Sequence, residues 1–125
     1  MPGEWRPYLM IGYKSVTGSA NDTIVWTTGA SEEVKISQLR FMSTGAYDIT
    51  RIADQGGIPY TNADTANVLD SNLWLNIGTP TEFSEIFLPV DWNLVPNTKI
   101  TFSVTDTSTA TNEIWILGIG SRRTL

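Results

Sequence analysis

The residue types that most often do chemistry in proteins are missing from this sequence. Among its 125 residues there is no histidine and no cysteine. This removes the commonest general base, the commonest metal ligand and any thiolate nucleophile. Ser-His-Asp and Cys-His catalytic arrangements cannot form within the chain. Disulfide bonds and thiolate zinc sites are excluded for the same reason.

Carboxylates are the remaining candidates for acid–base catalysis. A glycosidase needs two of them across a cleft, about 5 Å apart or about 6.5–9.5 Å apart according to its stereochemistry. Asp48, Asp54, Asp64 and Asp70 lie in the middle of the chain, but their spacing favours no pair. Scattered carboxylates on loops usually keep a protein soluble. The sequence therefore predicts a protein that is not an enzyme.

Oxygen ligands for a hard cation gather in the central segment. Residues 60–67 read Tyr-Thr-Asn-Ala-Asp-Thr-Ala-Asn, and calcium takes six to eight oxygen ligands of these kinds. The spacing of an EF-hand is absent, and loops rich in Asn and Asp are ordinary turn chemistry. We expect no metal and no cofactor, with calcium binding by the loop 53–67 left open. Gly118 is expected to mark a bulge or a close backbone approach.

Five tryptophans are the strongest candidates for binding. Trp26 alternates with threonines and is expected in the core. Trp5 lies in a proline-flanked arm and Trp92 in a proline-bounded loop, while Trp74 and Trp115 face away from the aliphatic rows of their strands. Aromatic residues outside a core are favoured at interfaces and sugar platforms, because they bury a large area at little entropic cost. Ordinary core or loop packing is the competing interpretation for these four.

Strands must position these residues, because apolar residues at the i, i+3, i+4, i+7 spacing of a helix are almost absent from the sequence. Apolar alternation between Gly, Pro, Asn, Asp and Ser clusters predicts strands at 8–13, 23–28, 34–41, 47–52, 73–77, 83–88, 99–105 and 113–119. Strands at this spacing predict an all-β fold, an antiparallel β-sandwich built as a jelly roll of about eight strands. Residues 1–7 are expected to form an N-terminal arm and 8–125 a single domain.

The same alternation predicts the core and one anomaly. The expected core residues are Ile24, Trp26, Leu39, Ile49, Leu75, Phe87, Ile100, Phe102, Val104, Ile114 and Ile116. The segment 113–119 is apolar on both faces, although one face of a strand in a two-layer sandwich should meet water. Either something else covers this strand, or its outer face meets a partner.

Charge and hydropathy narrow the range of partners. The net charge is −5, whereas a nucleic-acid binder needs a cationic face to neutralise phosphates. No apolar run approaches the roughly 20 residues of a membrane span. The opening residues Met-Pro-Gly-Glu lack the basic region of a signal peptide. We expect neither nucleic acid nor membrane as a partner, and synthesis in the cytoplasm.

Three runs in the C-terminal third together form a pattern of strand, proline-bounded loop, alternating strand, polar turn and final apolar strand. They are FSEIFLP at 83–89, VPNTKITFSV at 95–104 and NEIWILGIG at 112–120. This pattern of strands and turns resembles the closing strands of small single jelly-roll virion proteins of bacteriophages, of the penton, decoration or minor capsid type. The resemblance implies a capsid-associated structural role, symmetric assembly, and a place in the virion after synthesis in the host cytoplasm.

The sequence predicts two alternative functions. The first is a non-catalytic virion structural protein, a capsid decoration, penton or spike component that forms a homo-oligomer and contacts other capsid proteins. Its expected interface residues are Trp5, Tyr8, Trp115, Leu117 and Ile119. The alternative is a carbohydrate-binding β-sandwich module that recognises glycans through surface aromatics. The expected ligand platform consists of Tyr60, Trp74 and Trp92.

Overall fold

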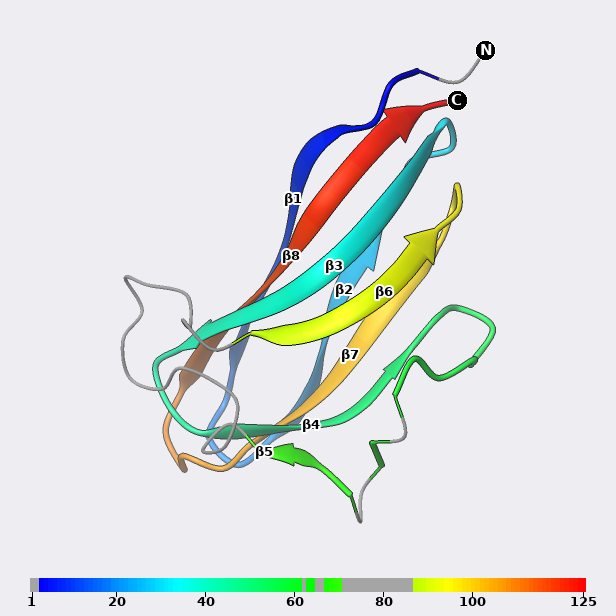
Figure 1. Ribbon diagram of the computed structural model, residues 1–125. Coiled ribbons are helices and arrows are strands. Elements are labelled where there is room, and N and C mark those ends of the chain that lie inside the picture. The colour runs from blue at the N-terminus through cyan, green and yellow to red at the C-terminus, as the bar shows by residue number, and fades with distance from the viewer. Residues whose placement is uncertain (1–2, 62, 65–66, 71–86) are drawn as a thin grey trace.

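The computed structural model describes residues 3–61, 63–64, 67–70 and 87–125, and all regular structure within them is β-strand (Figure 1). The strands are β1 (Arg6–Val16), β2 (Asn21–Thr27), β3 (Glu32–Ser43), β4 (Tyr47–Ala53), β5 (Leu69–Asp70), β6 (Leu88–Leu94), β7 (Lys99–Asp106) and β8 (Asn112–Thr124). Within the described ranges there is no helix with the length and apolar character needed to cross a membrane.

The strands form two four-stranded sheets, one in the order β1-β8-β3-β6 and the other in the order β2-β7-β4-β5. The ladders among the described strands are antiparallel. They join β8 to β1 and β3, β7 to β2 and β4, β3 to β6 and β4 to β5. The pairs β1–β8, β2–β7, β3–β6 and β4–β5 are nested, as happens when one long hairpin folds over into two layers. The predicted all-β antiparallel sandwich is therefore confirmed.

The outermost pairing is longer than the sequence pattern indicates. β1 begins at Arg6, inside the predicted arm, and the Gly3 backbone N–H donates to the Thr124 carbonyl at 2.6 Å. β8 runs on to Thr124, paired with Glu32 of β3, and its last residues also make cross-strand ion pairs. Arg122 lies 3.5 Å from Glu32, and Arg123 lies 3.0 Å from Glu33. The basic pair Arg122-Arg123 thus belongs to the sheet.

The prediction around Pro89 is wrong. A strand was expected to end at this proline, whereas β6 runs through it from Leu88 to Leu94. β6 lies at the edge of its sheet, where the missing proline N–H does not break a ladder. Trp92, expected in a loop, is therefore a strand residue. The expected strand 73–77 and residues 83–86 of the expected strand 83–88 lie outside the described residues.

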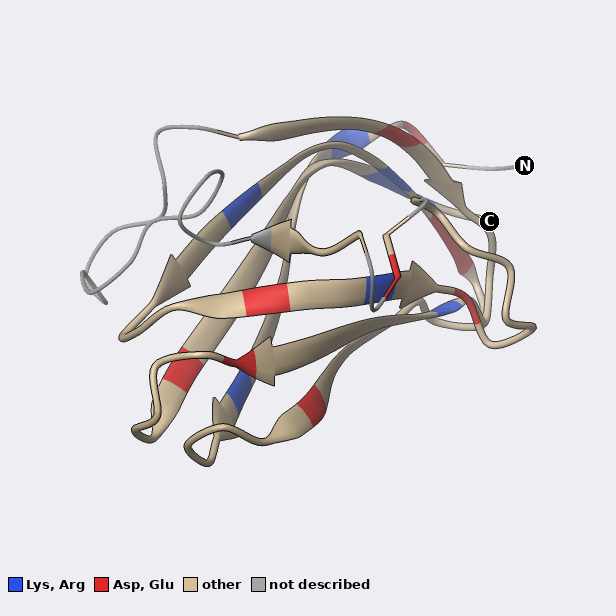
Figure 2. Ribbon diagram, turned by 90° about the horizontal axis from the view of Figure 1, so that it is seen from below, with Lys and Arg blue, Asp and Glu red and all other residues tan. Residues whose placement is uncertain are grey.

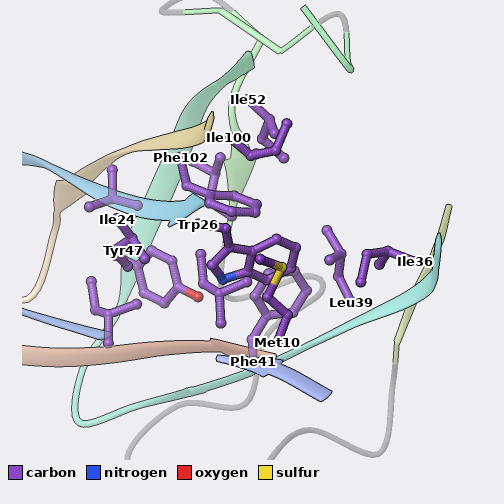
Figure 3. Packing of buried hydrophobic residues seen from close by; sticks show 14 of the residues in the cluster. Met10, Ile24, Trp26, Ile36, Leu39, Phe41, Tyr47, Ile52, Ile100 and Phe102 are labelled. Atoms are coloured by element: carbon purple, nitrogen blue, oxygen red, sulfur yellow. The ribbon is translucent and has the colours of Figure 1, made fainter. Parts of the chain in front are cut away.

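The core lies between the two sheets (Figure 3). The predicted core residues that prove buried are Ile24, Trp26, Leu39, Ile49, Ile100, Phe102, Val104, Ile114 and Ile116. Phe87 is 38% exposed, so its prediction is wrong. It precedes β6, and the Arg40 guanidinium lies 5.3 Å from its ring centroid. Leu75 falls outside the described residues.

Trp26 fills the space that two glycines of the opposite sheet leave free. A Cβ atom on Gly118 of β8 would lie 2.5 Å from Trp26 Cη2, and one on Gly12 of β1 would lie 2.9 Å from its Nε1. One indole therefore spans two strands. The close backbone approach expected at Gly118 is not found, because its nearest neighbours are side-chain atoms of Trp26 and Ile36, and it is Gly120 that lies against the backbone of Lys35. The bulge lies nearby, where the β3–β8 register shifts between Ile36 and Gln38.

A buried carboxylate ties together the turns at one end of the sandwich. Asp106, at the end of β7, is 2% exposed. It accepts backbone hydrogen bonds from Ser19 at 2.7 Å and Thr109 at 3.1 Å, both residues with left-handed φ, and side-chain bonds from Ser108 at 2.6 Å and Asn112 at 3.0 Å. Burial alone would raise the pKa of Asp106. The hydrogen bonds outweigh burial, so its pKa lies below the usual value.

Gly118→Ala should destabilise the fold, because its Cβ would overlap the Trp26 ring. We expect a loss of about 1–3 kcal/mol in the free energy of unfolding, as for other overpacked cores. Gly29→Ala is the matched control, since its Cβ would meet the Glu32 side chain at an ordinary 3.5 Å. Urea denaturation measures both variants. Equal stability of the two would contradict the packing described for Trp26.

Asp106→Asn should destabilise the protein at neutral pH and much less in acid. A carboxyl whose pKa is lower in the folded than in the unfolded chain stabilises the fold above its unfolded pKa, about 3.9. That stabilisation is lost as the pH falls through the folded pKa. Thermal unfolding at pH 7 and below pH 4 measures the difference. The exposed Asp91→Asn serves as control, and a pH-independent effect of Asp106→Asn would refute the ionic role.

Candidate functional site

The outer face of β1 carries a row of exposed apolar side chains. Leu9, Ile11 and Tyr13 are 57%, 59% and 48% exposed. Their neighbours Met10 and Gly12 face the core, since Met10 is buried and a Cβ on Gly12 would meet the Trp26 indole. Successive residues of a strand point to opposite faces. Leu9, Ile11 and Tyr13 are therefore directed to the surface.

The register with β8 extends this row into a patch. The pairs are Leu9 with Ile119, Ile11 with Leu117, and Tyr13 with Trp115. Leu117 is only 8% exposed, while Trp115 and Ile119 are partly exposed. We call these six residues the β1–β8 apolar face. It joins two adjacent strands of one sheet into a continuous hydrophobic surface.

Aromatic stacking holds one end of the β1–β8 apolar face. The rings of Tyr13 and Trp115 lie 5.0 Å apart between centroids, and the Tyr13 hydroxyl donates to Glu113 Oε1 at 3.0 Å. The hydrogen bond to Glu113 raises the pKa of Tyr13 above its usual value, so this ring is neutral at physiological pH. The end of the face is thus a fixed aromatic surface with an acidic rim.

The structure brings most of the predicted interface residues to this side of the sheet. Trp115, Leu117 and Ile119 lie within the β1–β8 apolar face. Trp5 lies toward its other end, with Lys35 Nζ 4.3 Å and the Arg123 guanidinium 4.8 Å from its ring. Trp5 therefore has local partners in its own sheet.

Tyr8 and the exposed residues of β1 differ from the sequence expectation. Tyr8 lies in the inward row of β1, and the Arg122 guanidinium sits 4.3 Å from its ring. Leu9, Ile11 and Tyr13 were not among the predicted interface residues. The signal that could have found them is Gly12: a strand that places a glycine in one row leaves the bulky row for another surface.

A cleft occupies the opposite edge of the sandwich. β6 is the edge strand of its sheet, and the other sheet ends in β5, which has two residues. A cavity of about 560 Å³ lies here, lined by Pro59, Tyr60, Thr61, Leu88, Pro89, Val90, Asp91, Trp92 and Asn93. The Tyr60 and Trp92 rings lie 5.1 Å apart between centroids. The structure therefore brings together two of the predicted platform residues, and Trp74 lies outside the described residues.

The central carboxylates take part in turns and in one strand pair. Asp54 Oδ1 accepts from the backbone N–H groups of Gly56 at 2.9 Å and Ile58 at 3.0 Å, and Asp64 Oδ1 accepts from that of Asn67 at 2.8 Å. This is the turn chemistry expected of such loops.

The remaining two acidic candidates meet in a ladder, since the β4–β5 register sets Asp48 opposite Asp70. Asp48 is not among the described residues that line the cleft beside β6. Over the ranges that the structure describes, no three His, Cys, Asp or Glu residues gather as a metal site. Acidic and basic positions are scattered along the strands of both sheets (Figure 2).

Comparisons with known proteins identify no family for this chain. No family model matches the chain, and no curated protein matches its sequence. Among solved structures, a chain titled "Cyanophage Pam1 capsid asymmetric unit" is similar over 98% of this chain and 86% of its own length, with 14% identity and a TM-score of 0.46. A likeness at this level assigns no function to the chain.

Proposed function

We propose that this chain is a non-catalytic structural protein of a virion, a capsid decoration, penton or spike component that assembles with copies of itself and contacts other capsid proteins. The β1–β8 apolar face is the observation that carries the assembly role. Removing apolar surface from water contributes about 25 cal/mol per Å². Contiguous apolar patches that remain exposed on a folded chain mark interaction sites more often than chance.

The charges around the β1–β8 apolar face suit a second copy of the same chain. Glu113 borders the end that holds Tyr13 and Trp115, while Lys35 and Arg123 lie beside Trp5 toward the other end. A two-fold contact places the same patch on both partners in opposite directions. The acidic end of one copy then meets the basic end of the other, around an apolar centre.

The virion setting rests on two further observations. The C-terminal third resembles the closing strands of small phage virion proteins, and the nested strand order of the two sheets is the plan used by viral capsid domains. The same plan also serves lectins, so fold alone does not set function. The exposed apolar face favours assembly among these uses.

Ile11→Lys should break the assembly. It places a cation at the centre of a self-complementary patch, where each copy would bring its own lysine against the other. Ile58→Lys is a matched control, because it makes the same change at a residue that is 62% exposed, against 59% for Ile11, and lies outside the β1–β8 apolar face. Native mass spectrometry and sedimentation velocity measure the oligomer.

We expect the unaltered chain and Ile58→Lys to form oligomers and Ile11→Lys to be monomeric with an unchanged thermal unfolding midpoint. A chain that stays strictly monomeric at high concentration and does not bind a capsid lattice would contradict the proposal. An oligomer that tolerates Ile11→Lys would place the interface elsewhere and refute the role of this face.

A further inference from the structure

We propose that the cleft between β6 and residues 59–61 is a binding site for a neutral saccharide. This site goes beyond the assembly role and does not depend on it. One wall of the cleft is the edge strand β6, and residues 59–61 form another. In β6, the partly buried Val90 and Trp92 alternate with the exposed Asp91 and Asn93.

Two aromatic rings form the apolar part of the site and are held in place by the fold. The Trp92 ring meets Trp26 edge-on at 6.5 Å and Phe102 at 6.4 Å between centroids. The Tyr60 backbone N–H donates to the Ile52 carbonyl at 2.8 Å, and Pro59 makes a β-bridge with Ala53. Rings fixed in this way lose little freedom when a ligand binds. The C–H faces of a sugar ring pack on such surfaces while its hydroxyls remain at the rim.

Polar groups at the rim match the hydroxyls of a sugar. Asp91, Asn93 and Thr61 line the cleft. Asp91 and Asn93 alternate with Trp92 along β6, so their side chains point to the opposite face of the sheet and bound the cleft only at its outer rim. Burial raises the pKa of Tyr60, and Asp54 adds to this, so the phenol stays protonated and can donate. A sugar hydroxyl both donates and accepts, so it can bond to the Tyr60 phenol and to the Thr61 hydroxyl.

Charge and backbone chemistry disfavour other ligand classes. The lining residues that the structure describes include one carboxylate and no Lys or Arg, so a phosphate, sulfate or other anionic group would find no counter-charge among them. An extended peptide could add to the edge of β6, but Pro89 lacks one backbone donor for such a ladder. A neutral, hydroxyl-rich ligand fits both the rings and the rim.

The cleft stays open in the proposed assembly. β1 and β6 are the two outer strands of the same four-stranded sheet, so the β1–β8 apolar face and the cleft lie at opposite edges. Self-association through one therefore leaves the other accessible. This separation makes failure of saccharide binding distinguishable from failure of assembly.

The test titrates the full chain with maltohexaose, cellohexaose and N-acetylchitohexaose, followed by calorimetry and by the NMR signal of the Trp92 indole. We expect saturable binding of at least one of them and an affinity about tenfold lower for Tyr60→Ala, which removes one stacking surface. Tyr60→Phe keeps the ring and should lose less. Ile58→Ala, two residues away and outside the lining, should bind as the unaltered chain does.

Three results would overturn the proposal. One is the absence of saturable binding by all three hexaoses to the folded chain. Another is binding that Tyr60→Ala leaves unchanged. The third is stronger binding of a heparin hexasaccharide or of an extended peptide than of the neutral sugars. Ile11→Lys should bind the sugar normally even as a monomer, so loss of assembly alone leaves the saccharide site intact.

Discussion

The fold depends on the contact between the Trp26 indole and the two glycines, Gly12 and Gly118, that face it from the other sheet. At this crossing, β1 and β8 present no side chain, so one indole from β2 fills the interior across both strands. The Trp26 N–H finds no acceptor among the described residues. An unsatisfied buried donor costs about 1–3 kcal/mol. The volume filled by the ring outweighs this cost, since an empty space of that size in a close-packed core would cost more.

The same contact determines what the outside of the sheet looks like. Because side chains alternate along a strand, a slip of one residue in β1 would drive Ile11 into the Trp26 ring and expose Gly12. The register is therefore locked, and Leu9, Ile11 and Tyr13 must face outward opposite the apolar row of β8. The β1–β8 apolar face is a direct result of core packing. Substitutions that loosen the core around Trp26 would also disturb this surface.

Much of the fold could be predicted from the sequence, and the exceptions have physical reasons. β7 alternates strictly between apolar and polar residues, and its row of Ile100, Phe102 and Val104 is buried as expected. β6 was missed because Pro89 and the mixed residues after it resemble a loop, and only its position at a sheet edge makes the proline tolerable. The exposed row of β1 was missed because both rows of residues 8–13 contain bulky apolar residues. Tyr60 and Trp92 meet only through tertiary structure, since 31 positions separate them in sequence.

The two edges of the β1-β8-β3-β6 sheet are protected against strand pairing in similar ways but differ in what they offer a partner. β1 carries Pro7 and Lys14, and β6 carries Pro89 and Asp91. Prolines and charges on edge strands oppose the addition of a further strand. A partner at β1 must therefore use the side chains on the face of the sheet, where the residues are apolar. At β6, the described residues that line the cleft set aromatic rings beside polar groups. Packing thus directs one edge toward protein surfaces and the other toward small polar ligands.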